Sequence, residues 1–596
     1  MALMKKTTNN TRKILKEIKL TGIPTSPGIA MGPIYIFRPF QLNISELEGE
    51  VEDIDREIIL FDNAIEKVYR QLENAQKNSE AYYKDQFSEI FESQKAFLKD
   101  PILINEIKQE IRTAKCSAAF AISKILSEKS EYFINLESTY FRERAYDIID
   151  LKQKLVNALL GIDVDYQLTT PAIVVAEMLS PSDTVNFNRN FILGFLTDKG
   201  GRTSHAAIMA RGLRIPSVVN RYNLSQVLHE DDFLILDGFT GAIIINPAEE
   251  TKKEYEAKQK DFVEFEKRLY KEIDASTVTT DGQPIELLAN IEFVHEVNDA
   301  RINKAEGIGL FRTESFFIEK NAIPDEEQQF HFYKQVVEQM NGHEVTIRVL
   351  DLGGDKLLPQ QSEESEMNPF LGWRAIRFLL DRPSIFRTQL RAILRASAFG
   401  NVKILIPMIS SVEEVKKTLQ LVEEAKSSLR SEKQQFNEDI EIGVMIETPA
   451  AAMLAEILAE YVDFFSIGTN DLTQYVLAID RTNEKVSKYF NTFNPAVLYF
   501  VENTIRIGRK RNLKVTLCGE FASIPEAIPL LLGMGLRSFS MNPFSLAGAK
   551  KIIRSLKIDE CEQLYARIKT MHTATEIEKA CFEFIKDHIS DLQYLK

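Results

Sequence analysis

The sequence predicts a multidomain α/β protein, in which an α/β domain is interrupted by an inserted helical bundle and followed by a C-terminal (β/α)8 TIM barrel. Three observations favour this fold class. The chain has 596 residues, enough for about three to five domains. Residues 44–160 contain almost no glycine or proline, although strand-like segments stand on either side of them. Eight apolar runs of strand type follow residue 276 and alternate with helical or mixed segments.

The first α/β domain is predicted in two pieces, residues 20–43 and 162–248, after an N-terminal extension of residues 1–19. From about residue 20 to 38, LTGIPTSPGIAMGPIYIF joins proline and glycine punctuation to a β-rich run, which is typical of strand and turn. Strand-like segments resume beyond Gly161. They are PAIVVAEM, FILGFLTD, DDFLILDG and GAIIINP.

The inserted bundle is predicted over residues 44–161. Its apolar residues recur at spacings of three and four, the period of an amphipathic helix. Ile54, Ile58, Phe61, Ile65 and Val68 are an example. Long packed helices are therefore expected here.

A connecting helix is predicted over residues 249–275, where a highly charged stretch carries an apolar residue at every third or fourth position. The barrel is predicted over residues 276–596. Its eight strand-like runs are ELLANI, GIGLF, VTIRVLD, VKILIPMI, IEIGVMIE, DFFSIG, KVTLCG and SFSMN. Polar residues fall at or just beyond the carboxyl ends of these runs, where barrel enzymes assemble their active sites. These residues are Arg312, Arg348, Asp351, Glu447, Asn470, Asp471 and Cys518.

The composition excludes several classes of protein. A formal charge of −14 argues against nucleic-acid binding, which usually needs a basic face. The four cysteines contain no CxxC pair, so neither a disulfide framework nor a cysteine zinc site is expected, and a reducing cytoplasm is the simplest setting. The N-terminus lacks the apolar core of a secretory signal, and no apolar run is long enough to cross a bilayer. We expect a cytoplasmic protein without a membrane partner.

A loop that begins Gly200-Gly201-Arg202 and ends at His205 precedes the helix-like AAIMARGL. Backbone N–H groups at a helix N-terminus attract anions, and the threonine, serine and arginine of the loop add donors and positive charge. Neutral imidazole is a good nucleophile near neutral pH, so His205 could accept a phosphoryl group. The alternative is a capped helix whose histidine merely forms a hydrogen bond.

Two further constellations lie at the predicted barrel mouth. Glu447 and Asp471 could converge as hard oxygen ligands of Mg²⁺, or they could be salt-bridge partners of nearby arginines. Several cations and one amide are expected on the same face, namely Arg312, Arg348, Arg374, Arg481, Lys356 and Asn470. Such a cluster fits a small substrate that carries both phosphate and carboxylate, with a structural ion-pair network as the alternative.

Cys518, in KVTLCGE, ends a predicted strand at the barrel mouth. Its thiol could donate a proton to a carbon such as that of an enolate. The alternative is an inert core residue, because buried cysteines usually behave as small hydrophobes.

Eight motifs stand in a fixed order along the chain: GGRTSHAAIMAR, GIGLFRTE, DLGGDK, NPFLGWRAIR, GVMIETPAA, SIGTNDLTQY, IDRTNE and LCGE. Together with SPGIAMG near the start and RERAYDIIDL before the second part of the α/β domain, they resemble enzyme I of the phosphoenolpyruvate:sugar phosphotransferase system. The resemblance runs from about Leu20 to the C-terminus. It implies a phosphoenolpyruvate-protein phosphotransferase that uses Mg²⁺.

The resemblance also implies roles for the domains and residues. A swivelling phosphohistidine domain would carry His205, the helical insertion would dock the phosphocarrier HPr, and the barrel would bind phosphoenolpyruvate and form a homodimer. Glu447 and Asp471 would be the metal ligands, and Cys518 would protonate the enolpyruvate. Phosphoenolpyruvate would be held by Arg312, Arg348, Asn470 and Arg481, with Arg374 and Lys356 as further contacts.

The chain departs from the family pattern at three places. Glu292 stands where glycine is expected and could add negative charge near the anion site. Phe521, Ala522, Ser523 and Ile524 follow CGE in place of x-A-G-D, and Gln94 stands where a histidine is common. These departures leave every catalytic residue in place.

Two other functions remain as alternatives. A pyruvate phosphate dikinase or phosphoenolpyruvate synthase would need a nucleotide-binding domain of some 200 or more residues, larger than most single domains, and the chain has no GxxxxGK[ST] loop. A regulatory homologue with reduced turnover would have no reason to keep the predicted catalytic residues together.

Overall fold

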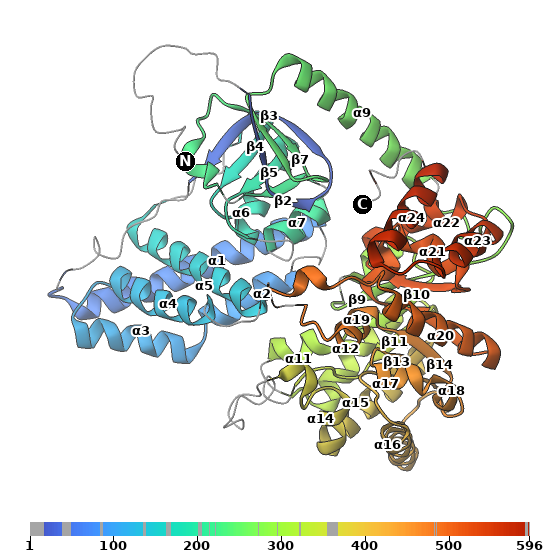
Figure 1. Cartoon of the computed structure of the whole chain (residues 1–596). Helices are drawn as coiled ribbons and strands as arrows, with labels where there is room; N and C mark the ends of the chain where they lie inside the picture. Colours follow the sequence, from blue (N-terminus) through green and yellow to red (C-terminus); the bar gives the residue numbers. More distant parts are fainter. Residues whose placement is uncertain are drawn as a thin grey trace. The chain divides into compact units, whose positions relative to one another are not determined.

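The computed structural model divides the chain into two compact units, Met1–Glu264 and Phe265–Lys596 (Figure 1). Each unit is described by itself. The structure describes residues 17–38, 49, 51–83, 88–134, 139–162, 168–200, 205–213, 215–220, 222–271, 273–294, 296–320, 323–353, 368–481, 483, 485–589 and 594.

An eight-stranded mixed sheet forms the α/β part of the first unit, in the order β1-β8-β7-β3-β4-β5-β6-β2. Its strands are β1 (Ile18–Thr21), β2 (Ile23–Ser26), β3 (Ile29–Phe37), β4 (Ala172–Ala176), β5 (Ile192–Thr197), β6 (Ser217–Val219), β7 (Phe233–Asp237) and β8 (Ala242–Ile245). Strands β3 to β6 pair in parallel, and the other pairings are antiparallel. The first strand begins two residues before the predicted domain start, and the four strand-like segments after Gly161 form β4, β5, β7 and β8.

Among the described residues between β3 and β4, five α-helices form the inserted bundle. They are α1 (Ile54–Tyr83), α2 (Ser88–Leu98), α3 (Pro101–Ala114), α4 (Ala118–Ile134) and α5 (Thr139–Leu160). The start of α3 follows from two residues. Pro101 takes the first helical position, and the Asp100 carboxylate caps the helix by accepting the Ile102 N–H. The core of the bundle also contains Met209, which comes from the helix that begins at His205. That helix therefore packs against the bundle as well as the sheet.

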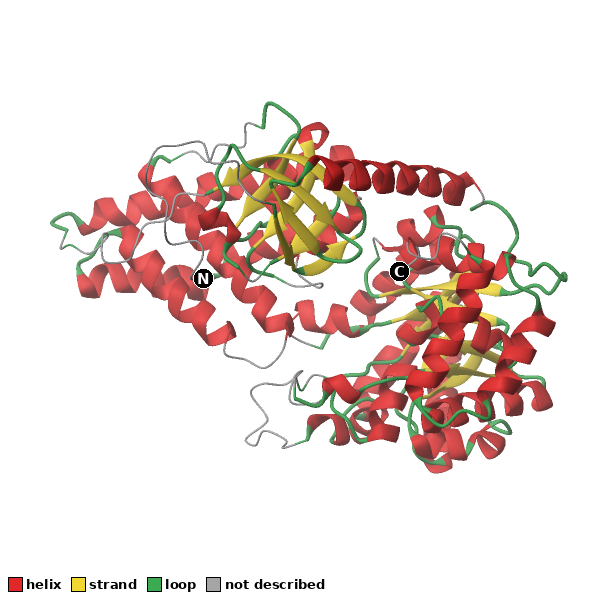
Figure 2. Ribbon diagram, turned by 45° about the horizontal axis from the view of Figure 1, so that its top comes forward, coloured by secondary structure: helices red, strands yellow, loops and turns green. Residues whose placement is uncertain are grey.

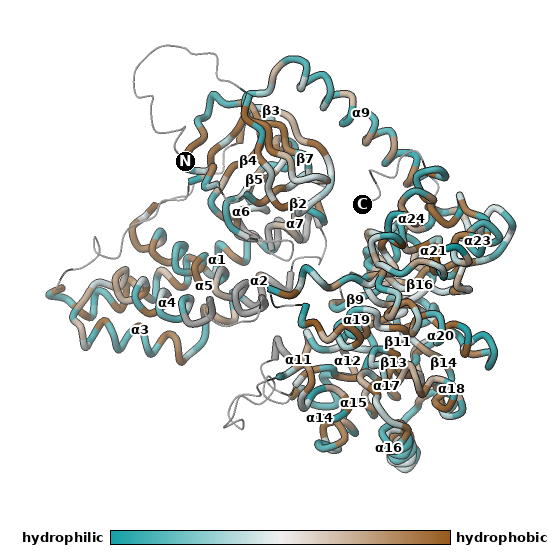
Figure 3. The backbone as a smooth tube through the Cα atoms, in the orientation of Figure 1, coloured by the Kyte–Doolittle hydropathy of each residue, from teal (hydrophilic) through white to brown (hydrophobic). Residues whose placement is uncertain are grey.

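The remaining helices of the first unit are α6 (Pro181–Asn186), α7 (His205–Leu213), α8 (Leu224–Val227) and the start of α9 (Glu249–Lys271). Figure 3 shows that most residues of α9 are hydrophilic. Its first half contacts the sheet through Tyr255, and Gln259 donates a hydrogen bond to the Ile29 carbonyl at 2.7 Å. This helix occupies the stretch where a connecting helix is predicted.

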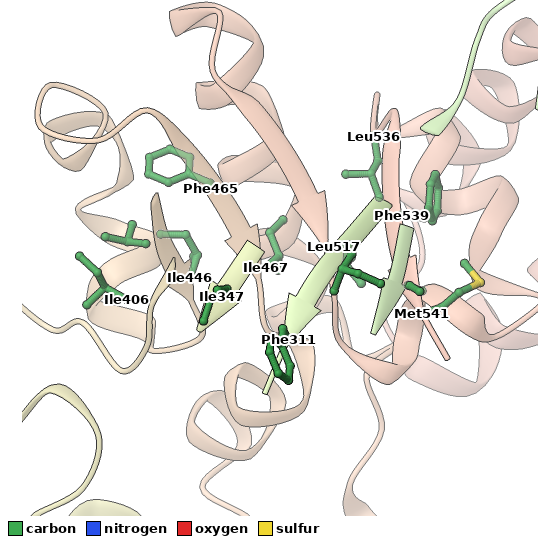
Figure 4. Packing of buried hydrophobic residues seen from close by; sticks show 14 of the residues in the cluster. Phe311, Ile347, Ile406, Ile446, Phe465, Ile467, Leu517, Leu536, Phe539 and Met541 are labelled. Carbon is green, nitrogen blue, oxygen red and sulfur yellow. The ribbon is translucent and has the colours of Figure 1, made fainter. Parts of the chain in front are cut away.

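A closed barrel of eight parallel strands forms the centre of the second unit, which confirms the predicted fold class (Figure 2). The strands are β9 (Glu286–Ile291), β10 (Gly307–Phe311), β11 (Glu344–Arg348), β12 (Val402–Ile406), β13 (Glu441–Ile446), β14 (Phe464–Ile467), β15 (Lys514–Leu517) and β16 (Ser538–Met541). Seven of the eight predicted runs contain one of these strands, and β11 begins one residue before the run VTIRVLD. Figure 4 shows apolar side chains of these strands, among them Phe311, Ile446 and Leu517, which are buried against the surrounding helices.

Helices surround the barrel. Those described are α10 (Glu296–Ile302), α11 (Glu314–Lys320), α12 (Glu326–Gln339), α14 (Ile376–Asp381), α15 (Pro383–Ala396), α16 (Val412–Ser431), α17 (Pro449–Met453), α18 (Ala455–Leu458), α19 (Thr469–Leu477), α20 (Pro495–Arg511), α21 (Ala527–Gly533), α22 (Leu546–Arg554), α23 (Ile558–Ile568) and α24 (Ala574–His588). None of the described helices is both long and apolar enough to reach across a lipid bilayer.

Candidate active site

Most of the predicted site residues lie at one end of the barrel. Because all eight strands are parallel, their carboxyl ends meet at the same rim. Arg312 directly follows β10, Arg348 ends β11, Glu447 follows β13 and Cys518 follows β15. Asn470 and Asp471 occupy the first turn of α19, which begins two residues after β14. The sequence therefore positions these residues through strand ends rather than through one long loop.

Two arginines and two carboxylates form a buried ion-pair network in the mouth. The Arg348 guanidinium contacts Glu314 at 2.9 Å and Asp351 at 3.1 Å. Arg374 donates to both oxygens of Asp351 at 2.9 and 3.0 Å. Burial alone would lower the pKa of each arginine, but the neighbouring carboxylates, Asp351 for both and Glu314 for Arg348, raise both pKa values above normal. Both guanidiniums are therefore permanent positive charges.

Glu447 and Asp471 are the two predicted metal ligands. Glu447 is 1% exposed and accepts the Met408 N–H at 2.7 Å. Burial, followed by the charges of Asp471 and Asp351, raises the pKa of Glu447 to about 8. Asp471 lies 3.7 Å from the Arg374 guanidinium, and its buried Oδ1 has no hydrogen-bond partner among the described residues.

These two carboxylates fit a hard divalent cation. A cation favours the ionised form of both carboxylates and would satisfy the unpartnered Asp471 oxygen. No group of three or more His, Cys, Asp or Glu side chains within the described residues forms a metal cage. A cation at this pair would thus take its remaining ligands from water and substrate, which is the usual manner for Mg²⁺.

Cys518 is buried at the end of β15, with 2% of its surface exposed. The Ser466 hydroxyl donates to its Sγ at 3.1 Å, and the thiol lies 3.6 Å from the Ile467 carbonyl. Burial raises the pKa of Cys518 to about 11, although the Ser466 hydrogen bond acts in the opposite direction. The thiol is therefore protonated near neutral pH and holds a transferable proton.

Asn470 and Arg481 lie on the α19 side of the mouth. Asn470 exchanges two hydrogen bonds with Glu520, because its Nδ2 donates to the carboxylate and its Oδ1 accepts the Glu520 N–H, both at 3.1 Å. This pair joins α19 to the segment after β15. Arg481 follows α19 and is exposed. Lys356 lies outside the described residues.

Arg312 carries the third guanidinium of the mouth. Its Nη1 contacts the Glu292 carboxylate at 2.6 Å, and both side chains are partly exposed. Burial and the nearby charge of Arg348 lower the pKa of Arg312, but the charge and hydrogen bond of Glu292, with the charge of Glu314, leave it raised. This contact places a carboxylate on Arg312, and the presence of an anion site beside it stays a prediction.

His205 is the first residue of α7 in the first unit. The described part of the preceding loop ends at Gly200, and residues 201–204 and the imidazole lie outside the description. His205 thus lies in the described part of α7, and its predicted placement at the N-terminus of that helix stays a prediction.

The other departures have local structural roles. Gln94 is buried in α2 and donates to Asp150 of α5 at 3.3 Å, so it belongs to the interior of the bundle. Phe521 is buried in a short 3₁₀ turn, Glu520–Ser523, and its ring stands edge-on to Phe493 with centroids 4.9 Å apart. The segment after Cys518 is therefore packed by an aromatic pair.

Sequence reasoning did not assign roles to Glu314, Ser466, Tyr475 or the contact of Glu292. The Tyr475 hydroxyl lies 3.5 Å from Arg374 and donates to the Phe370 carbonyl. Its position four residues after Asp471 on one helix is a signal that could have identified it. Glu314 and Ser466 lie in two of the motifs, but their partners Arg348 and Cys518 are distant in sequence and become neighbours only in the folded barrel.

Comparison with known proteins matches both units. The PEP-utilising enzyme, N-terminal family matches residues 21–144, the PEP-utilising enzyme, mobile domain family matches residues 168–241, and the PEP-utilising enzyme, PEP-binding domain family matches residues 266–558. Phosphoenolpyruvate-protein phosphotransferases from Staphylococcus carnosus (strain TM300), Priestia megaterium and Bacillus subtilis (strain 168) are 39%, 41% and 40% identical to the chain. The alignments cover 96%, 96% and 94% of this chain and 100%, 99% and 98% of those proteins. The similarity therefore spans nearly the full length on both sides.

Proposed function

Because the chain belongs to the phosphoenolpyruvate-protein phosphotransferase family, we propose that it transfers the phosphoryl group of phosphoenolpyruvate to its own His205 and then to a histidine of an HPr-type phosphocarrier protein. The observation that carries this proposal is the pair of unsatisfied buried groups in the barrel mouth. Arg348 Nε and Asp471 Oδ1 are both buried without a hydrogen-bond partner in the described part of the chain. The Arg348 group is a positively charged donor that can bind an anion. The Asp471 oxygen is a negatively charged acceptor that can bind a cation.

Three guanidiniums supply the anion-binding groups. Arg312, Arg348 and Arg374 can each present parallel N–H donors to a phosphate or a carboxylate. Two of the three are held by buried carboxylates, so their orientation is fixed before the substrate arrives. We assign Asn470, Arg481 and Lys356 to the same substrate on the motifs that contain them.

In the first half-reaction, the bond between phosphorus and the enol oxygen breaks and a bond between phosphorus and a ring nitrogen of His205 forms. The enolpyruvate left behind takes a proton at its terminal carbon from the Cys518 thiol, which gives pyruvate. Water then returns a proton to the thiolate. The raised pKa of Cys518 supports this role because it keeps the proton on sulfur until it is needed.

Glu447 and Asp471 would hold a Mg²⁺ ion, which when bound would neutralise phosphate charge and orient the substrate. Burial and the charges of Asp471 and Asp351 disfavour the ionised form of Glu447, and a divalent cation would offset that negative charge.

Phosphoryl transfer requires movement between the two units. His205 belongs to the first unit and the arginine cluster to the second. The domain that carries His205 would therefore swivel toward the barrel to receive the phosphoryl group and then toward the phosphocarrier docked on the helical insertion.

Assembly and location complete the proposal. Exposed Met453, Ile457 and Tyr499 come from three helices in mutual contact, α17, α18 and α20, and would form part of a homodimer interface of the barrel. All four cysteines are free and buried, which fits a reducing cytoplasm. The acidic balance supports a protein partner rather than a nucleic acid.

The direct test is incubation of the purified protein with phosphoenolpyruvate and Mg²⁺ without nucleotide. Mass spectrometry under mildly alkaline conditions should find one phosphoryl group on the peptide that contains His205. A His205→Ala variant should bind phosphoenolpyruvate and remain unphosphorylated. A requirement for ATP, or phosphorylation of the alanine variant, would refute the proposal.

A further inference from the structure

The three guanidiniums of the barrel mouth differ in how tightly their carboxylate partners are enclosed. Arg348 and Arg374 pair with Glu314 and Asp351, whose side chains are 13% and 3% exposed. The partner of Arg312 is Glu292, whose side chain is 44% exposed. A buried carboxylate cannot leave its arginine without a large desolvation penalty, whereas an exposed carboxylate can rotate into water.

The backbone at Glu292 is fixed, so its side chain is the part that can move. The Glu296 carboxylate accepts the N–H groups of Glu292 and Phe293 at 2.6 and 3.0 Å. On the other side, the Ser315 hydroxyl donates to the Glu292 carbonyl at 2.8 Å. Release of Arg312 therefore needs only a change of the Glu292 rotamer and no rearrangement of the loop.

We propose that Glu292 is an internal competitor for the substrate: its carboxylate occupies the anion-binding face of Arg312 and must be displaced when phosphoenolpyruvate binds. The inference rests on the proposed function and adds a residue that sets affinity and selectivity at the same site. A ligand with two separate anionic groups gains enough contacts across the cluster to displace Glu292. A simple anion such as inorganic phosphate has fewer contacts to offset the lost ion pair, so Glu292 discriminates against it.

The test compares the substrate kinetics of the unaltered full-length protein with those of two variants that differ from it only at Glu292. Glu292→Gln removes the charge at constant size, and Glu292→Ser removes the reach to Arg312. Both variants should lower the KM for phosphoenolpyruvate by about two- to fivefold, the range that a partly exposed ion pair provides, with kcat little changed. The inhibition constant of inorganic phosphate should fall at least as much.

A matched control makes the same change from glutamate to glutamine at a position outside the barrel mouth. Glu424→Gln breaks an exposed ion pair of the same type, with Arg387 at 2.8 Å, between α16 and α15 on the outside of the barrel. Its KM and its inhibition by phosphate should equal those of the unaltered protein. If the two Glu292 variants instead match the unaltered protein, or if their KM rises, Glu292 is not a competitor.

The two proposals fail in different ways. If the unaltered protein forms no phosphohistidine from phosphoenolpyruvate, the proposed function is wrong. If it forms phosphohistidine with a KM that the Glu292 substitutions do not lower, the function stands and the inference about Glu292 is overturned.

Discussion

If Cys518 donates the proton as proposed, the Ser466 hydroxyl is placed to assist that transfer. It lies on β14, next to β15, and donates a hydrogen bond to the Cys518 sulfur at 3.1 Å. When the thiol gives up its proton, negative charge develops on the sulfur atom, and a donor already aimed at that atom stabilises it. Ser466 would therefore be a positioning residue that acts through Cys518.

Ser466→Ala should therefore lower kcat by about two- to tenfold, the value of one buried hydrogen bond, while the KM for phosphoenolpyruvate changes little. Steady-state pyruvate release measures both constants. Ser538→Ala is the matched control, because it removes a buried hydroxyl of the same barrel that donates to Glu286 and contacts Thr516 rather than Cys518. A loss of kcat of equal size in both variants would assign the effect to general destabilisation.

At the same scale, the limits of sequence reasoning have a physical cause. Residues that end strands could be predicted to share a rim, because parallel strands bring their carboxyl ends together. The partner of each residue could not be predicted. Arg374 contacts Asp351 across a segment that is partly outside the description, and Ser466 reaches Cys518 from 52 residues earlier in the chain. Such pairs depend on side-chain directions that only the folded barrel defines.

Among the structural elements, the approach of β15 to α19 depends on Gly519. A Cβ at this position would lie 1.9 Å from Thr469 Oγ1 and 2.6 Å from the Thr469 backbone nitrogen. The second contact is with backbone, which cannot rotate away, so the start of α19 would have to shift. That start carries Asn470 and Asp471, and the strand end carries Cys518.

Gly519→Ala should thus reduce the rate of phosphohistidine formation by about a hundredfold or more, because displacements near 1 Å misalign reacting groups. The variant should still unfold cooperatively in a thermal melt. Gly400→Ala serves as the control, since its new methyl group also meets a close neighbour, the buried Val337 side chain at 2.7 Å, but lies before the start of β12, away from the mouth. Retention of full activity by Gly519→Ala would show that the two elements need not approach so closely.

The turn between β9 and α10 predicts a pH dependence of stability. Burial raises the pKa of Glu296 to about 7, and the charges of Glu292 and Asp299 act in the same direction. The folded protein then holds a proton that the unfolded chain releases near pH 4.5, so the stabilisation is complete below about pH 4.5 and is lost as pH rises through about 7.

Glu296→Gln keeps an oxygen that can accept the two backbone N–H groups and removes the charge. Relative to the unaltered protein, this variant should gain about 1 to 3 kcal/mol of unfolding free energy at pH 8 and almost none at pH 5. Denaturant unfolding of the second unit at the two pH values measures the difference. An equal effect at both pH values would mean that Glu296 does not titrate in this range.

For the whole molecule, the alternation of strands and helices was enough to predict the barrel and the interrupted α/β domain. Eight successive apolar runs predict the eight barrel strands. The scarcity of glycine and proline indicates the inserted helices. The additional contact of Met209 with the bundle core had no signal in the chain, since an apolar helix residue looks the same whichever partner covers it. Sequence periodicity shows which face of an element is buried, but it does not identify the element that buries it.

At this largest scale, α9 connects the two units between which the proposed phosphoryl transfer would occur. Tyr255 and Gln259 attach its first half to the sheet of the first unit, and Phe265 packs in the second unit against Tyr594, with ring centroids 5.5 Å apart, and under the Lys551 ammonium. If the connection serves to keep the two units at high effective concentration, lengthening it should slow transfer without affecting substrate binding.

A segment of ten glycine and serine residues inserted after Glu264, at the boundary between the two units, tests this role. Phosphoenolpyruvate binding, measured by calorimetry on the His205→Ala background, should be unchanged because the barrel is intact. Phosphohistidine formation in a single turnover should continue at a rate lower by up to about tenfold, as expected when a flexible tether dilutes one unit relative to the other. The same insertion after Gln434, in the exposed connection between α16 and β13, should leave the rate unaltered. Complete loss of transfer with binding retained would mean that α9 imposes a fixed geometry, and an undiminished rate would mean that the connection does not control the encounter of the two units.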